Sequence, residues 1–205
     1  PGGLPEAFLI GEKFIGKENV CLILGDNFFY GQSLTQKLTD CIKLKRGARV
    51  LLHPVKNPEN YGVAKMNKRE KIISIIEKPK QSKSNLAITG LYFFDNHVIE
   101  YSKKLKPSKR KELEITDLLN KYKRKKKISY ELLGRGGTWL DAGSILDFYD
   151  ASNFVSTIEK RQGLKIGCLE EIALKNKWVS KNDIEKAILY YGNSEYSKYL
   201  KSIIK

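Results

Sequence analysis

Apolar residues fall into short runs that alternate with longer amphipathic stretches. Val20–Leu24 is a compact apolar run, which predicts a buried strand that ends in a loop at Gly25. Ala48–Val55 and Leu86–Phe94 have the same character. Apolar residues at helical spacing predict helices at Leu4–Phe14, Ser33–Arg46, His97–Lys104 and Ile115–Lys126. This alternation favours an α/β fold, with a mixed, mainly parallel sheet and helices on both of its faces.

The middle and the C-terminal part of the chain depart from this alternation. Lys71–Ile76 is strand-like and is followed by the turn-rich segment Lys78–Ser84, as expected of strands added beside a main sheet. Ile128–Leu133 is a further strand candidate, and after Asp141 the pattern is helical. We therefore expect a single domain over residues 1–205, with an α/β core at 1–150 and a helical tail at 151–205.

Composition agrees with a globular domain. The 205 residues are 41% hydrophobic, which is enough apolar material for one core. No apolar stretch approaches the roughly 20 residues of a membrane-spanning helix, and the N-terminus lacks the basic-then-apolar pattern of a signal peptide. We expect a cytoplasmic protein without a membrane partner.

The formal net charge of +15 raises the question of a nucleic-acid partner. The basic residues are mostly lysines spread along predicted helices, as in Lys121–Lys127, where Tyr122 is the only aromatic residue. Such runs are usually solvated helix faces, so we predict no nucleic-acid partner and keep a basic binding module as an alternative. The three scattered cysteines and two histidines lack the spacing of a metal site built from sulfur or imidazole, so a metal here should have oxygen ligands.

Two aspartates follow predicted strands, at the positions where α/β enzymes carry their active-site residues. Asp26 follows the first predicted strand, in Leu24–Gly31 (LGDNFFYG), and Asp141 follows a short apolar piece in Gly136–Gly143 (GGTWLDAG). Two carboxylates on adjacent strand ends would suit Mg²⁺, which binds through one or two carboxylates and completes its shell with waters and substrate phosphates. For Asp26 alone, capping of the next helix is an equal alternative.

The segments between the two aspartates supply further candidates. Glu77 can accept hydrogen bonds from sugar hydroxyls, while the adjacent Lys78 can neutralise a phosphate; the alternative is a surface ion pair before a proline turn. Ile88–Phe94 would be a core strand, with Gly90 marking a bulge or the close approach of a ligand.

Several separated motifs follow one another along the chain: LGDNFFYG, YGV, IEKP, AITGLYFFD, KELEITD, WLDAG and a helical tail at Ala151–Ala173. In order and spacing, over essentially the whole chain, they resemble the bacterial glucose-1-phosphate thymidylyltransferases. The resemblance implies a Rossmann-like, glycosyltransferase-A-like nucleotidyltransferase fold. It also implies Mg²⁺-dependent transfer from dTTP to glucose 1-phosphate, giving dTDP-glucose and pyrophosphate for dTDP-rhamnose and cell-surface polysaccharide synthesis.

The resemblance also implies roles for individual residues. Asp26 and Asp141 match the Mg²⁺ ligands and, with Lys78, the catalytic residues. The matched substrate-binding positions are Gly3 (at the thymine base), Asp26, Gly62, Glu77, Lys78, Ile88 and Tyr92. Members of the family are homotetramers with a feedback site for dTDP-rhamnose, and the regions matching that site contain Tyr30, Gly31, Arg135 and Glu159.

One family feature is missing from the sequence. Related enzymes begin with a strand and a loop of the form G-x-G-x-R-L-x-P-x-T, followed by a lysine, which bind the triphosphate; no such loop occurs here. We therefore expect an N-terminally truncated domain that lacks the nucleotide-binding segment and is inactive by itself. Because base-reading residues lie mostly in that segment, uridylyl or adenylyl transfer to a sugar phosphate stays open as an alternative.

Overall fold

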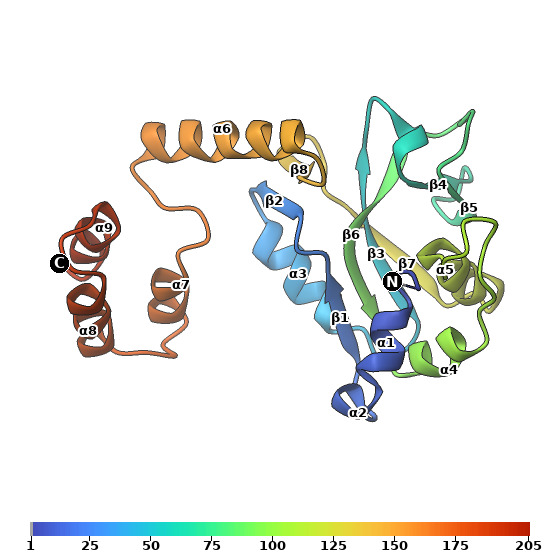
Figure 1. Cartoon of the computed structure of the whole chain (residues 1–205), viewed down its shortest axis with the longest axis horizontal. Coiled ribbons are helices and arrows are strands. Elements are labelled where there is room, and N and C mark those ends of the chain that lie inside the picture. Colours follow the sequence, from blue (N-terminus) through green and yellow to red (C-terminus); the bar gives the residue numbers. More distant parts are fainter. Residues whose placement is uncertain (1) are drawn as a thin grey trace. The chain divides into compact units, whose positions relative to one another are not determined.

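The computed structural model describes residues 2–205 as two compact units, the first ending at Ser144 and the second spanning Ile145–Lys205 (Figure 1). The first unit contains, in chain order, α1 (Glu6–Ile10), α2 (Glu12–Ile15), β1 (Val20–Ile23), β2 (Asn27–Gly31), α3 (Leu34–Ile42), β3 (Ala48–Pro54), η1 (Pro58–Asn60), β4 (Gly62–Met66), β5 (Ile72–Glu77), β6 (Leu86–Phe94), α4 (His97–Lys103), α5 (Ile115–Arg124), β7 (Ile128–Leu132) and β8 (Gly137–Asp141). These elements confirm the predicted α/β class, and the last strand of the first unit ends at Asp141.

The main sheet of the described chain is mixed. Its strand order is β5-β4-β6-β3-β7, and β1 pairs with β6 beside β4. Among these pairings only β3 with β7 is parallel, and the others are antiparallel. The prediction of a mixed sheet is confirmed, but its mainly parallel character is wrong for the described strands. β6 runs opposite to β1, β3 and β4, and β4 and β5 form a further antiparallel pair.

Side-chain alternation on the central strands divides the interior into two layers. Val50 and Leu52 of β3 face a core formed with α1, α4 and α5, whereas Leu51 faces the opposite side, toward α3. All three side chains are fully buried, each contributing about 1.5–3 kcal/mol of transfer free energy. Figure 1 shows α4 and α5 together on one side of the sheet and α3 on the other, which confirms helices on both faces.

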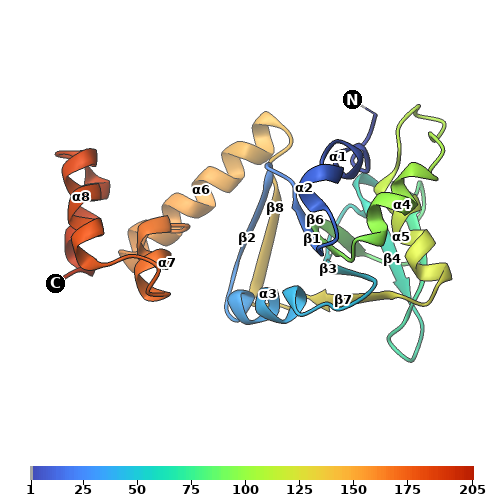
Figure 2. The ribbon, with the colours of Figure 1, turned by 90° about the horizontal axis from the view of Figure 1, so that it is seen from below.

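A two-stranded antiparallel ribbon formed by β2 and β8 stands beside the main sheet (Figure 2). The sequence analysis predicted a loop after Val20–Leu24 and only a short apolar piece before Asp141, and it did not predict that the two segments pair as a ribbon. Its register sets Asn27 opposite Asp141 and Gly31 opposite Gly137. The aspartates expected on adjacent strand ends thus lie together at one end of this ribbon.

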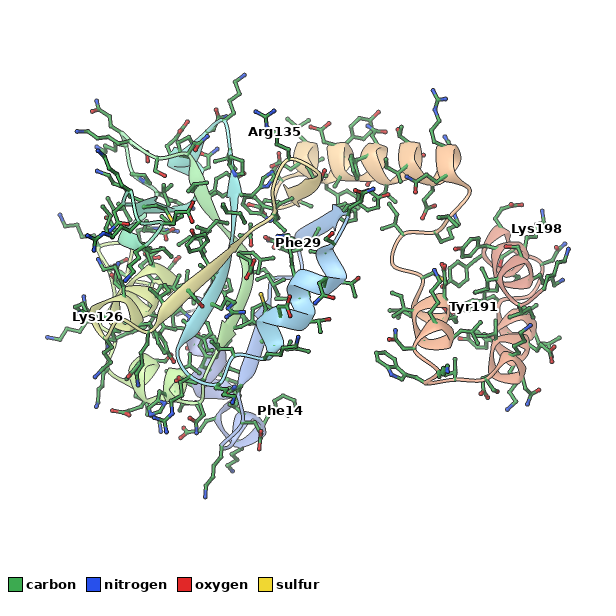
Figure 3. All side chains as sticks on the ribbon, turned by 180° about the vertical axis from the view of Figure 1, so that it is seen from behind. Phe14, Phe29, Lys126, Arg135, Tyr191 and Lys198 are labelled. Atoms are coloured by element: carbon green, nitrogen blue, oxygen red, sulfur yellow. The ribbon has the colours of Figure 1, made fainter. Side chains whose placement is uncertain are left out.

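The N-terminal helix differs from the prediction. Leu4–Phe14 was expected as one helix, but it divides at Gly11 into α1 and α2. Glycine destabilises a helix interior by roughly 1 kcal/mol relative to alanine, which weakens the helix at that point. Phe8 of α1 is buried, whereas the side chain of Phe14 of α2 is 94% exposed and projects away from the backbone (Figure 3).

Helices are the regular elements of the second unit among its described residues. It contains α6 (Ile145–Gln162), α7 (Leu169–Lys175), α8 (Lys181–Tyr191) and α9 (Glu195–Ile203). Its own core is built on Cys168, Ile184, Ile188 and Leu200. The helical tail expected from 151 begins earlier, at Ile145, and no helix in the described chain has the length and apolar character needed to cross a bilayer.

A buried polar cluster fastens α5 to the end of β6. Asp95, which is 3% exposed, accepts hydrogen bonds from the Tyr122 hydroxyl (2.8 Å) and from the Gly47 backbone N–H (2.7 Å). Tyr122 is fully buried, so the aromatic ring of the Lys121–Lys127 run packs in the core. A stacked nucleic-acid base would have no access to that ring.

We expect Tyr122→Phe to lower the free energy of unfolding by about 1–3 kcal/mol, because it removes a buried donor from a carboxylate. Urea unfolding followed by Trp139 fluorescence in a Trp178→Phe background measures this. Tyr130→Phe is the matched control, since the hydroxyl of Tyr130 makes no hydrogen bond among the described residues. Equal unfolding free energies for the two phenylalanine variants would contradict the stabilising role of the cluster.

Candidate active site

A cavity of about 230 Å³ opens where the β2–β8 ribbon meets the ends of β1, β4 and β5 and the face of β6. Its walls come from the first unit alone. The lining residues are Leu4, Leu24, Asp26, Asn27, Asn60, Tyr61, Gly62, Glu77, Lys78, Ile88, Gly90, Tyr92, Arg110, Glu112, Leu113, Glu114, Ile115, Thr116, Trp139 and Asp141.

Asp26 is carried by a tight turn between β1 and β2. The N–H of Asn27 donates to the carbonyl of Leu24 (3.1 Å), which closes a four-residue turn with Gly25 and Asp26 at its centre. The Leu24 N–H in turn donates to the carbonyl of Gly90 (2.9 Å). The turn that presents Asp26 is therefore fixed to the central strand of the main sheet.

The carboxylates of Asp26 and Asp141 converge. The Ala142 N–H donates to the carbonyl of Asp26 (2.8 Å), which closes the end of the ribbon. A Cβ atom placed on Gly143 would lie 3.4 Å from Asp141 Oδ1 and 3.7 Å from Asp26 Oδ2. Both oxygens thus face one small region, and two such carboxylates fit the oxygen ligands that Mg²⁺ prefers. The described residues hold no cluster of three or more His, Cys, Asp or Glu side chains suited to a metal.

The wall opposite the ribbon is formed at the end of β5. Glu77 pairs in register with Gly62 of β4, and the Lys78 N–H donates to the carbonyl of Tyr61 (3.0 Å). Lys78 has a φ of 40°, in the left-handed region that side chains other than glycine rarely adopt, at a cost of about 1 kcal/mol or more. Such strain persists where the surroundings fix the conformation, here between a strand end and Pro79.

Burial tunes the acid–base chemistry of this wall. The pKa of Glu77 is raised above its ordinary value of 4.5 because the carboxyl is removed from water; Glu114 raises it further, and a hydrogen bond from Thr116 opposes the shift. The pKa of Tyr92 is also raised, mainly by burial and then by the charges of Glu77, Asp141 and Asp26. The Tyr92 hydroxyl accordingly stays a neutral hydrogen-bonding group between the two walls.

The structure brings most of the sequence-predicted site residues together. Seven of them line this one cavity: Asp26, Gly62, Glu77, Lys78, Ile88, Tyr92 and Asp141. Gly3 stands beside it, since its neighbour Leu4 is a lining residue. The φ of Gly3 is +102°, and a Cβ there would lie 2.2 Å from the carbonyl oxygen of Leu113, so the N-terminal turn packs directly on the segment before α5.

Three of the four candidate regulatory residues lie away from the carboxylates, at the other end of the ribbon. Tyr30 and Gly31 pair with Thr138 and Gly137 of β8. Arg135 is on the loop that leads into β8 (Figure 3). Along a strand this end is roughly 13 Å from Asp26, at about 3.3 Å per residue.

Glu159, the fourth candidate, belongs to α6 in the second unit. It accepts hydrogen bonds from Lys165 Nζ (2.6 Å) and the Ile166 N–H (3.0 Å). Burial opposes ionisation of this carboxyl, but the two hydrogen bonds prevail and its pKa is lowered. Within its unit, Glu159 holds the chain that follows α6.

The sequence analysis missed the segment that precedes α5 as a cavity wall. Arg110 lies 3.8 Å from Glu77, 3.3 Å from Glu112 and 3.8 Å from Glu114, which places a second cation beside Lys78 in the cavity. KELEITD was recognised as a motif, but its residues were given no role in the site. An arginine directly before this motif, which contains Glu112 and Glu114, was the available signal.

Known proteins related to this chain identify its family. A sequence model described as "Nucleotidyl transferase" matches residues 1–158. Glucose-1-phosphate thymidylyltransferases from Neisseria meningitidis and Mycobacterium tuberculosis are 47% and 40% identical to this chain, over 100% of the chain and 71% of each relative. The chain thus spans about 71% of the length of these curated relatives.

Solved structures of related enzymes share the fold of this chain. A structure named as a glucose-1-phosphate thymidylyltransferase from Bacillus anthracis is 41% identical, with a TM-score of 0.66, over 75% of this chain and 61% of that one. A UDP-glucose pyrophosphorylase in complex with UDP-glucose is 29% identical, with a TM-score of 0.67, over 76% and 62%. From the cavity, the motifs and these relatives, the chain belongs to the nucleotidyl transferase family, among the glucose-1-phosphate thymidylyltransferases.

Proposed function

We propose that residues 2–144 form the sugar-phosphate and metal side of a thymidylyltransferase site, which serves the transfer of a thymidylyl group from dTTP to glucose 1-phosphate. The observation that carries this is the cavity itself, with paired carboxylates on one wall and two cations on the other. The described residues include no glycine-rich phosphate loop, and the curated relatives are longer than this chain. The proposal therefore concerns the part of the site that these residues build.

In the proposed reaction a phosphate oxygen of glucose 1-phosphate attacks the α-phosphorus of dTTP. A new P–O bond forms as the bond from the α-phosphorus to the oxygen bridging to the β-phosphorus breaks, and pyrophosphate leaves. Lys78 and Arg110 neutralise and orient the attacking phosphate, because phosphoryl transfer depends mostly on positioning and charge stabilisation. The carboxylate of Glu77 accepts hydrogen bonds from sugar hydroxyls.

Asp26 and Asp141 are the residues that would hold Mg²⁺. Bound there, the ion would supply charge stabilisation at the phosphate oxygens. The donor set supports this assignment, since carboxylate oxygens suit a hard cation and none of the described residues that line the cavity is a cysteine or a histidine. Gly62 lines the part of the cavity proposed to bind the sugar. A Cβ atom there would lie 2.8 Å from Thr116 Cγ2, so a larger residue would press on the cavity wall.

A uridylyl transfer is the second candidate, because UDP-glucose pyrophosphorylases have the same fold. The thymidylyl reaction is favoured by sequence identity to the relatives of each kind. The curated thymidylyltransferases are 38–48% identical to this chain, whereas the matched UDP-glucose pyrophosphorylase chains are 29% and 30% identical. Comparing dTTP with UTP as nucleotidyl donors in a longer version of the protein that carries a glycine-rich phosphate loop would separate the two, with faster release of pyrophosphate from dTTP expected.

The proposal is tested by binding of glucose 1-phosphate to the chain, measured by calorimetry. We expect binding in the presence of Mg²⁺, and a loss of about tenfold or more in Lys78→Ala, because a charge-assisted hydrogen bond to phosphate contributes roughly 1.5–3 kcal/mol.

Lys80→Ala is the matched control, since Lys80 is an exposed lysine close in sequence that does not line the cavity. An unchanged affinity in this control is expected. Equal losses in Lys78→Ala and Lys80→Ala, or no binding by the unaltered chain, would reject the proposed sugar-phosphate site.

The raised pKa of Glu77 leads to a pH dependence. As the pH falls through that pKa, the carboxylate is protonated and sugar hydroxyls lose an acceptor, so affinity should fall at a pH above the ordinary value of 4.5. The phosphate group of the ligand also titrates, with a second pKa of about 6. The ratio of wild-type to Glu77→Gln affinity removes that contribution.

We therefore expect the affinity ratio to exceed one at neutral pH and to approach one as Glu77 becomes protonated. Calorimetry at a series of pH values measures it. A ratio that is constant with pH would show that ionisation of Glu77 has no part in sugar binding.

A further inference from the structure

The amide of Asn27 joins three strands at the cavity. Its Oδ1 accepts hydrogen bonds from the Gly90 N–H of β6 (2.8 Å) and from Trp139 Nε1 of β8 (2.6 Å). Its Nδ2 donates to Asp26 Oδ1 (2.8 Å). One side chain at the start of β2 therefore contacts the central strand, the partner strand of the ribbon and a carboxylate of the cavity.

These contacts leave the amide one orientation. Backbone N–H and indole Nε1–H are donors only, so both require the carbonyl oxygen of the amide. Rotating the amide by 180° would set its NH₂ group against both donors. The NH₂ group must then point toward Asp26, which is a carboxylate and accepts it.

The consequence falls on the two oxygens of Asp26. Oδ1 accepts a hydrogen bond from the Asn27 amide, while Oδ2 lies 3.7 Å from a Cβ atom placed on Gly143, a point that is 3.4 Å from Asp141 Oδ1. A carboxylate held by one oxygen cannot rotate freely about its χ2 angle. The Asn27 amide thus directs Asp26 Oδ2 toward the region that both aspartates share.

Gly90 is required by this arrangement. A Cβ atom at Gly90 would lie 2.5 Å from both Cγ and Oδ1 of Asn27, well inside contact distance. Its φ is outside the left-handed region, so the need is for space rather than for an unusual backbone conformation. The register between β3 and β6 also shifts here, between Leu52 opposite Ile88 and Val50 opposite Tyr92, so β6 bulges at Gly90.

We infer that Asn27 is a positioning residue, which sets Asp26 for metal binding, and that Gly90 is a glycine because a side chain there would displace the Asn27 amide. The inference rests on the proposed metal role of Asp26 and Asp141. Groups that orient a metal ligand typically contribute tenfold or more to metal affinity. Asn27 reaches this effect through Asp26 and not through a contact of its own with the reacting groups.

The test is metal affinity of the full chain, with Mn²⁺ as the paramagnetic probe and its free-ion EPR signal as the readout. Asn27→Ala should weaken Mn²⁺ binding by about tenfold or more. Gly90→Ala, which removes no functional side chain, should weaken it to a similar extent by moving the amide. Gly136→Ala is the matched control, because a Cβ at Gly136 meets nothing within 4 Å, and it should bind as the wild type does.

The double variant separates positioning from general destabilisation. If Gly90→Ala acts only by displacing the amide, it should have no further effect once Asn27 is alanine, whereas independent losses of stability would add. Fluorescence of Trp139, measured in a Trp178→Phe background, should change in both single variants, because its indole loses its acceptor. Thermal unfolding of each variant checks that the fold is retained.

The outcomes distinguish the positioning role of Asn27 from the metal-binding role of Asp26 and Asp141. Mn²⁺ binding by the wild type that is lost in Asp26→Asn but unchanged in Asn27→Ala and Gly90→Ala would overturn the positioning role alone. Additive losses in the double variant would overturn it as well. No Mn²⁺ binding by the wild type would overturn the metal role of the aspartates, and this inference with it.

Discussion

Hydrogen bonding along both edges of β6 is the constraint on which the first unit depends. One edge pairs with β3, and the other pairs with β4 near its start and with β1 near its end. A buried strand must satisfy its backbone polar groups, so its neighbours have few alternative positions. Both layers of the core pack against its two faces, and buried Asp95, just beyond its end, fastens α5 to it.

The cavity depends on the same strand. At Gly90 the backbone carbonyl accepts from Leu24, and the N–H donates to Asn27, so the turn bearing Asp26 is bonded to β6 on both sides. Ile88 and Tyr92 of β6 line the cavity floor. The carboxylates, the cation-bearing wall and the core are therefore parts of one bonded framework, and displacement of β6 would move the functional groups relative to one another.

Much of this could be predicted from the sequence, for reasons that are physical. β3, β6 and α5 were located because their burial makes their apolar runs long or strongly periodic. β2 and β8 were missed because they form a short, partly buried ribbon, whose strands have no long apolar run and whose only strand pairing among the described residues is with each other. Arg110 was missed because it lies in a segment without periodicity, and its partner Glu77 is distant in sequence. The parallel character of the sheet was overestimated because the direction of β6 is set by pairing, which leaves no mark on hydrophobic pattern.

The sequence by itself determined the α/β class, the family through its separated motifs, and the identity of the two aspartates, Glu77 and Lys78. Those features are local, since each depends on residue type and near-neighbour spacing. Only the tertiary structure decided that the aspartates converge, that Asn27 has one amide orientation, and that Gly90 is small to admit it. These depend on groups far apart in the chain, such as Asn27 and Trp139, whose contact arises from strand pairing and side-chain packing.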